Sequence, residues 1–193
     1  MKKVFIIHGW GGSPDEEIHK WMKQELESNG FEVNVLTMPN TDEPKIEEWI
    51  PFLKENAKDP DENTFFIGHS IGCQTILRYL ETLPENKKIG GTVLIAPWIS
   101  LLETAYENPE EEKKIAKHWL ETPIDWENVK THTNNFVAIF SDNDFCVPLS
   151  DKNIFEEKLR SKIIVEHNKG HFTEENNITK VPSAISSLME MSK

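Results

Sequence analysis

The sequence predicts an α/β fold with a mainly parallel, six-stranded sheet and helices on both faces. Short runs of β-branched and aromatic residues alternate along the whole chain with segments of helical periodicity, and this alternation is typical of parallel sheets. These runs are apolar at nearly every position, as expected of strands that are buried on both faces. With 193 residues, the chain is long enough to bury one substantial core. We therefore expect one domain spanning residues 1–193.

Six runs are expected to form the strands of this sheet. They are Val4–Ile7, Phe31–Leu36, Phe65–Ile67, Gly91–Ala96, Phe136–Phe140 and Ile163–Val165. Helical periodicity places helices over 15–28, over 46–57, after Ser70, over about 109–121 and from near Pro182 to the end. Pro51 lies inside the second of these helices, where it predicts a kink or a division into two pieces.

Residues 97–134 interrupt the regular alternation. This stretch contains three tryptophans and one convincing helical pattern, and it lies between the fourth and fifth expected strands. An insertion at this place could form a small cap over the carboxyl edge of the sheet. The alternative is that Trp119 and its neighbours simply pack on the core, and the sequence leaves both readings open.

The composition excludes several classes of partner. The formal net charge is −12, from 33 acidic and 21 basic residues, which argues against nucleic acid and anionic membrane surfaces. The apolar run Val4–Ile7 is too short for a signal peptide, and no apolar stretch approaches the length of a membrane span, so the cytoplasm is the expected compartment. Cys73 and Cys146 are expected to be free thiols, because the chain shows no secretory signal. Two isolated cysteines also form no zinc pattern.

The most informative stretch is residues 68–72, which read Gly-His-Ser-Ile-Gly. An apolar strand precedes this stretch and an apolar helix follows it, which is the context of a nucleophile elbow. In such an elbow a sharp turn exposes the hydroxyl of Ser70, and the small residues Gly68 and Gly72 let strand and helix approach closely. The pattern alone can arise by chance, so an acid and a histidine further along the chain are needed to support it.

Both an acid and a histidine occur where a serine nucleophile needs them. The fifth strand is followed by Asp142 and Asp144, and the sixth by His167 and His171. The order serine, acid, histidine, each after a successive strand, is that of the α/β-hydrolase arrangement. We expect His171 to be the general base, because it lies further past its strand than His167, and we favour Asp144 as the orienting acid. Asp142 stays open as the alternative, with a role in bonding the turn backbone.

An acyl-transfer site also needs donors for the developing oxyanion. We expect these to be the backbone N–H of Ile71, which follows the nucleophile, and that of Trp10, in the glycine-rich loop after the first strand. That loop does not have the spacing of a dinucleotide- or phosphate-binding motif. Among the aromatic side chains, Trp98, Trp119 and Phe145, together with Trp10, could line a small apolar substrate pocket or equally belong to the core.

Four motifs together resemble the small serine hydrolases related to retinoblastoma-binding protein nine and bacterial YdeN. They are His-Gly-Trp-Gly-Gly-Ser-Pro at 8–14, Gly-His-Ser-Ile-Gly at 68–72, Asp-Asn-Asp-Phe-Cys-Val-Pro at 142–148 and Lys-Gly-His-Phe at 169–172. The resemblance covers essentially the whole chain and implies a compact α/β-hydrolase that lacks the usual first two strands. It implies the triad Ser70, Asp144 and His171. Many hydrolases have glycine three residues before the acid, and Ser141 stands there in this chain.

These observations predict a serine hydrolase of the carboxylesterase type (EC 3.1.1.-), acting on an ester, thioester or activated amide of a small acyl substrate. No cofactor and no metal are expected. The resemblance implies no particular natural substrate, because the substrates of the family are poorly defined. It does not predict a pocket-protein partner either, because the Leu-x-Cys-x-Glu segment associated with that binding is absent around Cys73. The alternative is a non-catalytic module that keeps the fold and binds a protein.

Overall fold

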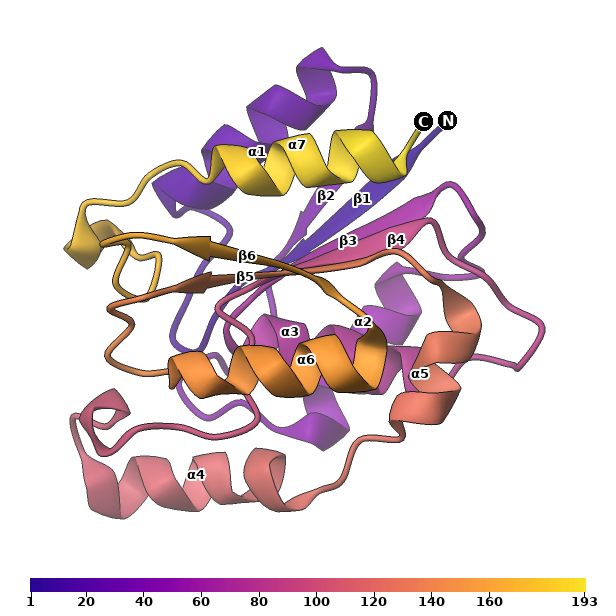
Figure 1. Ribbon diagram of the computed structural model, residues 1–193. Coiled ribbons are helices and arrows are strands. Elements are labelled where there is room, and N and C mark those ends of the chain that lie inside the picture. Colours follow the sequence, from indigo (N-terminus) through magenta and orange to yellow (C-terminus); the bar gives the residue numbers. More distant parts are fainter.

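The computed structural model describes residues 1–193 and shows one sheet of six parallel strands, in the order β2-β1-β3-β4-β5-β6. Helices cover both faces of the sheet, with α1 and α7 on one side and α2, α3, α5 and α6 on the other (Figure 1). The predicted fold class is therefore confirmed. No helix combines the length and the apolarity needed to cross a membrane.

The elements follow the alternation seen in the sequence. The strands are β1 (Lys3–Ile7), β2 (Glu32–Leu36), β3 (Thr64–His69), β4 (Gly91–Ile95), β5 (Phe136–Ser141) and β6 (Lys162–Glu166). The helices are α1 (Glu17–Ser28), α2 (Ile46–Asn56), α3 (Ile71–Glu81), α4 (Pro109–Glu121), α5 (Trp126–His132), α6 (Lys152–Leu159) and α7 (Pro182–Met191). Short 3₁₀ turns cover Glu103–Ala105, Leu149–Asp151 and Glu174–Asn176. All six strands lie within two residues of their expected bounds.

The order of the strands places a switch point between β1 and β3. The chain runs from β1 outward to β2, then returns to the other side of β1 and continues outward through β3 to β6. In open α/β sheets, ligands bind in the crevice that forms at the carboxyl ends of strands at such a point. The loops after β1 and β3 flank this crevice, and they contain Trp10 and Ser70.

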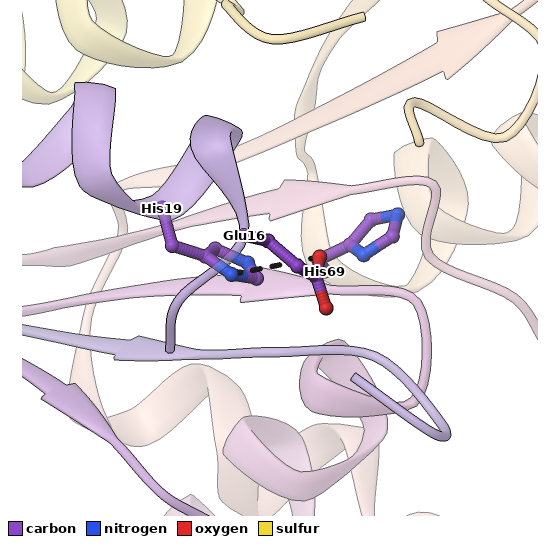
Figure 2. A group of neighbouring side chains, drawn as sticks. All are labelled: Glu16, His19 and His69. Atoms are coloured by element: carbon purple, nitrogen blue, oxygen red, sulfur yellow. Dashed lines mark ion pairs between the residues drawn. The ribbon is translucent and has the colours of Figure 1, made fainter. Parts of the chain in front are cut away.

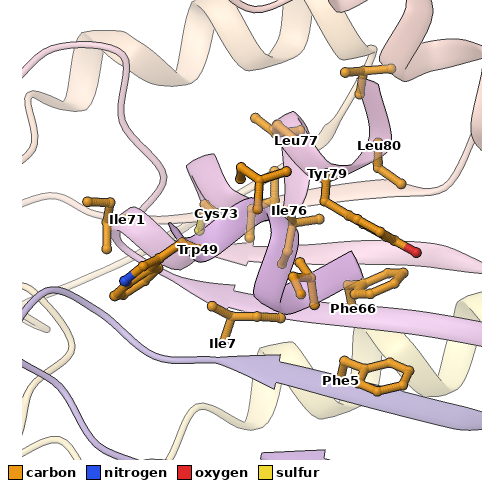
Figure 3. Close-up of a cluster of buried hydrophobic side chains, with 14 of the residues drawn as sticks. Phe5, Ile7, Trp49, Phe66, Ile71, Cys73, Ile76, Leu77, Tyr79 and Leu80 are labelled. Carbon is orange, nitrogen blue, oxygen red and sulfur yellow. The ribbon is translucent and has the colours of Figure 1, made fainter. Parts of the chain in front are cut away.

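Successive residues of each strand enter two separate cores. Phe5, Ile7 and Phe66 point to the face of α2 and α3, whereas Val4, Ile6 and Ile67 point to the face of α1 and α7. Figure 3 shows the first core, where side chains of α3 pack between the helix and strands β1 and β3. Burial of apolar side chains in both cores holds the helices against the sheet. The carboxyl ends of the strands, where Trp10 and Ser70 lie, are thereby held in place.

Helix α2 corrects one expectation from the sequence. It runs without interruption from Ile46 to Asn56 through Pro51, so the division into two pieces is wrong. A proline inside a helix loses its own N–H bond and strains the preceding turn. Trp49 and Leu53, both fully buried, anchor the two halves of this helix on the same core and keep it continuous.

Residues 97–134 form a partly separate layer. Helix α4 lies outside α2 and α3, away from the sheet (Figure 1). Trp119 joins it to the core: its ring meets that of Trp49 edge-on at 6.2 Å, and its indole N–H donates to the carbonyl of Pro44. The guanidinium of Arg78 donates to the carbonyl oxygens of Trp119 and Thr122. These contacts anchor the carboxyl-terminal half of α4.

Candidate active site

Ser70 occupies a strained turn between β3 and α3. Its backbone has φ 52° and ψ −119°, a conformation that a residue with a side chain adopts only at an energetic cost. The turn is held by the Ser70 N–H, which donates to the carbonyl of Ile95 at 2.9 Å. The result is a serine side chain placed at the carboxyl edge of the sheet, at the start of α3.

The glycines on either side of this turn are required by space. A Cβ on Gly68 would lie 2.7 Å from the backbone nitrogen of Cys73, and one on Gly72 would lie 2.3 Å from the carbonyl oxygen of Ile7. Real Cβ atoms do not approach backbone atoms so closely. Strand β1, strand β3 and helix α3 can therefore meet only if both positions lack a side chain.

We expect Gly72→Ala to lower the free energy of unfolding by about 3 kcal/mol or more, because backbone must move to relieve the contact with Ile7. Gly30→Ala is the control: Gly30 has φ +85° with open space around it, so its alanine adds backbone strain alone, about 1–2 kcal/mol. Urea unfolding of both variants measures the difference. Equal losses would mean that the close approach at Gly72 is not what the elbow requires.

Three side chains from three loops are hydrogen-bonded in series. The Ser70 hydroxyl lies 2.9 Å from His171 Nε2, and His171 Nδ1 lies 2.8 Å from Asp144 Oδ2 and 3.1 Å from Oδ1. The carboxylate can only accept, so His171 carries its proton on Nδ1 and presents a lone pair at Nε2 to the serine. This arrangement gives the hydroxyl proton an acceptor, as an activated serine nucleophile needs.

Asp144 is fixed by its own loop. Its Oδ1 accepts from the backbone N–H groups of Cys146 at 2.8 Å and Val147 at 3.0 Å, and the side chain is only 3% exposed. The carboxylate therefore holds one orientation toward the imidazole.

The two residues that sequence reasoning left as alternatives pair with each other. Asp142 Oδ2 lies 2.5 Å from His167 Nδ1, and Oδ1 accepts from the backbone N–H of Asn168. These bonds hold the pKa of Asp142 below its usual value, the backbone bond being the larger cause. The His167 side chain is 79% exposed, so this pair lies at the surface, apart from Ser70.

A network of polar side chains that the sequence did not point to sets the position of His171. Asn176 Oδ1 accepts from the His171 N–H at 2.8 Å, and Asn143 Oδ1 accepts from the Gly170 N–H at 2.9 Å. Ser141, which stands where many hydrolases have glycine, donates to Asn143 and accepts from the backbone N–H of Lys169. The acid loop and the histidine loop are thereby joined by side chains, whose role becomes visible only when the two loops are seen together.

His69, next to the nucleophile, supports the same loop from the other side. Its Nε2 bonds to the carbonyl of His171 at 2.8 Å. A carbonyl only accepts, so Nε2 carries the proton and Nδ1 is left with a lone pair. Burial holds the pKa of His69 well below its usual value, and the neighbouring His171 lowers it further. His69 is therefore a neutral donor at this position.

Two backbone N–H groups near Ser70 are free to bind an oxyanion. Neither Trp10 N nor Ile71 N donates a hydrogen bond within the protein. Ile71 is the first residue of α3, where N–H groups have no partner inside the helix. The loop of Trp10 is anchored by its indole N–H, which donates to the carbonyl of Asp42, and by the Gly11 N–H, which donates to Thr41.

Ser70 and His171 open into a cavity of about 540 Å³. Trp10, Ile71 and Trp98 are among its lining residues, so these expected site residues come together with the serine. The lining also includes Leu101, Ala105 and Tyr106 from the segment after β4.

Two of the expected pocket residues lie elsewhere. Trp119 is buried against Trp49 and does not line the cavity, so it has the core position that the sequence left open as the alternative. The helical spacing that places Trp119 on the inner face of α4 could not show which neighbour that face meets. Phe145 is not part of the lining either. It is 42% exposed, and its ring lies 6.3 Å from that of His171.

A family model described as serine hydrolase matches residues 4–190. The chain belongs to the serine hydrolase family. This serine hydrolase is 28% identical to the hydrolase YdeN of Bacillus subtilis over 94% of its own length and 91% of that protein. It is 27% identical to the serine hydrolase RBBP9 of Rattus norvegicus, over 86% of this chain and 78% of that protein.

Solved structures show the same fold. The crystal structure of the ydeN gene product from B. subtilis has a TM-score of 0.89 at 26% identity, and covers 99% of this serine hydrolase and 98% of the other chain. Est1E from Butyrivibrio proteoclasticus, with ferulic acid bound, has a TM-score of 0.75 at 15% identity, covering 99% of this chain and 89% of the other. The predicted resemblance to YdeN and RBBP9 is thus confirmed.

The serine hydrolase contains a further anchor that the sequence did not reveal. Asp151 is buried, and its carboxylate accepts from the backbone N–H groups of Ile99 and Ser100 and from the Ser100 hydroxyl. These bonds fix the loop after β4, directly beyond Trp98 in the cavity wall. No motif marks Asp151 in the sequence, because its partners lie about fifty residues earlier.

The thiol of Cys146 also lines the cavity, but it is not poised to react. Burial, with the nearby charges of Asp144 and Glu175, raises the pKa of Cys146 to about 12. Burial likewise raises the pKa of Cys73 well above its usual value. Because the thiolate is the nucleophilic form, neither cysteine competes with Ser70 at neutral pH.

Proposed function

We propose that this serine hydrolase cleaves an ester, thioester or activated amide of a small acyl substrate, through Ser70, His171 and Asp144. The observation that carries the proposal is the uninterrupted relay from the Ser70 hydroxyl through His171 to Asp144, with Ser70 facing a cavity large enough for a small molecule. A non-catalytic binding module would not need this relay. The carboxylesterase type is the class we expect.

In the proposed reaction, the Ser70 oxygen attacks the carbonyl carbon while its proton passes to His171 Nε2. The negative charge that develops on the carbonyl oxygen is stabilised by the N–H groups of Trp10 and Ile71. Asp144 holds the imidazole in orientation and stabilises the imidazolium that forms. His171 then protonates the leaving group as it departs, leaving the acyl group on Ser70. A water molecule, deprotonated by His171, finally releases the acid.

The first test is the hydrolysis of p-nitrophenyl acetate followed in the pre-steady state. An acyl-enzyme intermediate predicts p-nitrophenol turnover above the uncatalysed rate, with a burst of up to one equivalent where deacylation limits the rate. Turnover that is indistinguishable from that of Ser70→Ala across acetate, butyrate and thioester substrates would contradict the proposal.

The charge of the cavity narrows the class of substrate. Five glutamates line it, and no lysine or arginine does. They are Glu16, Glu107, Glu112, Glu174 and Glu175. At neutral pH such a wall repels anions and favours neutral or cationic molecules. We therefore propose that the substrate has a neutral or cationic body and does not carry phosphate or carboxylate groups near the scissile bond.

We expect the butyrate ester of p-nitrophenol to be hydrolysed with a kcat/KM about tenfold or more above that of the singly charged succinate ester, because the added carboxylate must enter this wall. The double variant Glu107→Gln, Glu175→Gln should bring the kcat/KM values of the two esters closer together. Glu55→Gln, Glu85→Gln is the matched control, since both residues are exposed and neither lines the cavity. If the ratio of the two kcat/KM values were the same in the wild type and both double variants, the charge of the cavity wall would not determine the specificity.

A further inference from the structure

Beside the nucleophile lies a second group of polar side chains that the proposed reaction does not use. Glu16 directly precedes α1, His19 lies in its first turn, and His69 ends β3 next to Ser70. One donor atom from each of the three residues lies within 4.8 Å of the other two. Figure 2 shows the Glu16 carboxylate drawn between the two imidazole rings. The loop after β1, helix α1 and the elbow thus meet at one point.

Each of the two imidazoles has one nitrogen fixed by the backbone and one without a partner. His69 Nε2 donates to the carbonyl of His171 at 2.8 Å, and His19 Nδ1 donates to the carbonyl of Ser13 at 2.9 Å. The remaining nitrogens, His69 Nδ1 and His19 Nε2, are buried and have no hydrogen-bond partner. Histidines that bind metals are held in the same way, with the other N–H donated to a carbonyl or carboxylate.

Both rings are also in the form that a metal requires. Burial lowers the pKa of His19 to about 4 and holds that of His69 well below its usual value. Each ring donates one N–H to a backbone carbonyl, so the neutral ring has its lone pair on the other, unpartnered nitrogen. A buried lone pair without a donor is costly to leave unsatisfied, and both His19 Nε2 and His69 Nδ1 are in this position.

The Glu16 carboxylate lacks a cation. Its Oε1 accepts from the Ser13 N–H at 2.8 Å, and Oε2 lies 3.6 Å from His19 Nδ1. No lysine or arginine pairs with it, and burial, together with the nearby charge of Glu174, raises its pKa. Glu16 lines the cavity, as does His69. A cation could thus reach the group from the cavity.

We propose that Glu16, His19 and His69 form a binding site for a divalent transition metal ion of the Zn²⁺ type. Two imidazole nitrogens and one carboxylate oxygen suit zinc rather than magnesium or calcium, which prefer oxygen ligands alone. A water molecule in the cavity would supply the fourth ligand. Zinc–nitrogen bonds of about 2.1 Å in a tetrahedron place ligand atoms roughly 3.4 Å apart. The group must therefore contract from its present spacing, and the half-buried Glu16 side chain has the freedom to do so.

Binding would oppose the proposed reaction. The rings of His69 and His171 lie 5.2 Å apart, so a cation at His69 disfavours the imidazolium that His171 becomes when it takes the serine proton. We infer that the site is inhibitory. This consequence rests on the proposed function, whereas metal binding itself does not.

A second group must be separated from this one in any test. Asp144, Cys146 and His171 also place one donor atom each within 4.8 Å of the others, and a metal bound there would block the reaction directly. The two groups differ in chemistry, because only the second contains a thiol. Co²⁺ bound by a thiolate shows an intense charge-transfer band in the near ultraviolet, and Co²⁺ bound by two imidazoles and a carboxylate does not.

The test is calorimetric titration of the tag-free full chain with Zn²⁺, and optical titration with Co²⁺. We expect one equivalent to bind, without a thiolate band, and each of Glu16→Gln and His19→Gln to weaken the affinity about tenfold or more. Cys146→Ser should bind as the wild type does. His132→Gln is the matched control, because His132 is also buried with one nitrogen on a backbone carbonyl and one unpartnered.

Several outcomes would overturn the site. They are the absence of saturable binding, unchanged affinity in both Glu16→Gln and His19→Gln, or loss of binding in Cys146→Ser. Circular dichroism of each variant shows whether it is folded. If His19→Gln does not fold, Glu16→Gln still provides the test, because glutamine keeps the oxygen that accepts from the Ser13 N–H. If Zn²⁺ bound as expected but saturating Zn²⁺ did not affect hydrolysis, the inhibitory role would be overturned. The assignment of the metal site itself would stand.

Discussion

Ser70→Ala is expected to lower kcat/KM for p-nitrophenyl acetate by about 10⁴-fold or more, because no other nucleophile faces the cavity in its reactive form. The variant should fold as stably as the wild type. The lost hydroxyl makes one hydrogen bond, to His171, and alanine keeps the Cβ that the elbow already accommodates. Initial rates and urea unfolding measure the two effects.

Cys146→Ala is the control for this result. The thiol lines the same cavity, so it is the strongest rival for a covalent step, yet its pKa of about 12 keeps it protonated. Activity within a few fold of wild type is expected. If Cys146→Ala lost as much activity as Ser70→Ala, the assignment of the nucleophile would have to be reopened.

Asp144→Asn is expected to lower kcat by about 10⁴-fold, and Asp142→Asn to change it by less than a few fold. The amide of an asparagine at 144 can donate to His171 Nδ1, which favours the tautomer with its proton on Nε2 and removes the base from Ser70. Asp142 bonds His167 and the backbone N–H of Asn168 at the surface, so it has no path to the serine. Initial rates of the two purified variants are the measurement.

This pair of variants is matched in chemistry, since both change one oxygen to NH₂ in the same loop. The result also separates the two assignments that the sequence left open. A large loss in Asp142→Asn with little change in Asp144→Asn would transfer the role of the acid and contradict the observed relay.

Much of the site could be predicted because its members are marked by local rules. Ser70 lies between two glycines that the elbow needs, and the acid and the histidine follow successive strands of one parallel sheet. Since the carboxyl ends of parallel strands meet at one edge, chain order alone brought Asp144 and His171 near Ser70. The family resemblance added the same residues, and the structure shows them hydrogen-bonded in series.

What escaped prediction depends on contacts between distant segments. No sequence feature near Trp119 indicates that the inner face of α4 packs against Trp49 of α2 rather than lining the cavity. The side chain of Asn176 accepts a hydrogen bond from the backbone N–H of His171, a contact that depends on how the chain turns back between these two residues. The continuity of α2 through Pro51 depends on buried partners that helix propensity does not include. Periodicity shows which face of an element is apolar, but the partner of that face is set by topology.

The role of residues 97–134 as a cap stays a prediction. Leu101, Ala105 and Tyr106 of this segment contribute to the cavity wall, which is the place a cap would occupy. Helix α4 itself is anchored through Trp119 and Arg78, so any movement would have to occur in the loop before it.

Whether Ser70 is an activated nucleophile is tested most directly by labelling the wild type with a fluorophosphonate, read by intact mass and located by peptide mapping. This reagent phosphonylates a serine only when a base has activated it. We expect one adduct, on Ser70, and none on Ser70→Ala. An unlabelled but folded wild type, or an adduct on a different residue, would contradict this expectation.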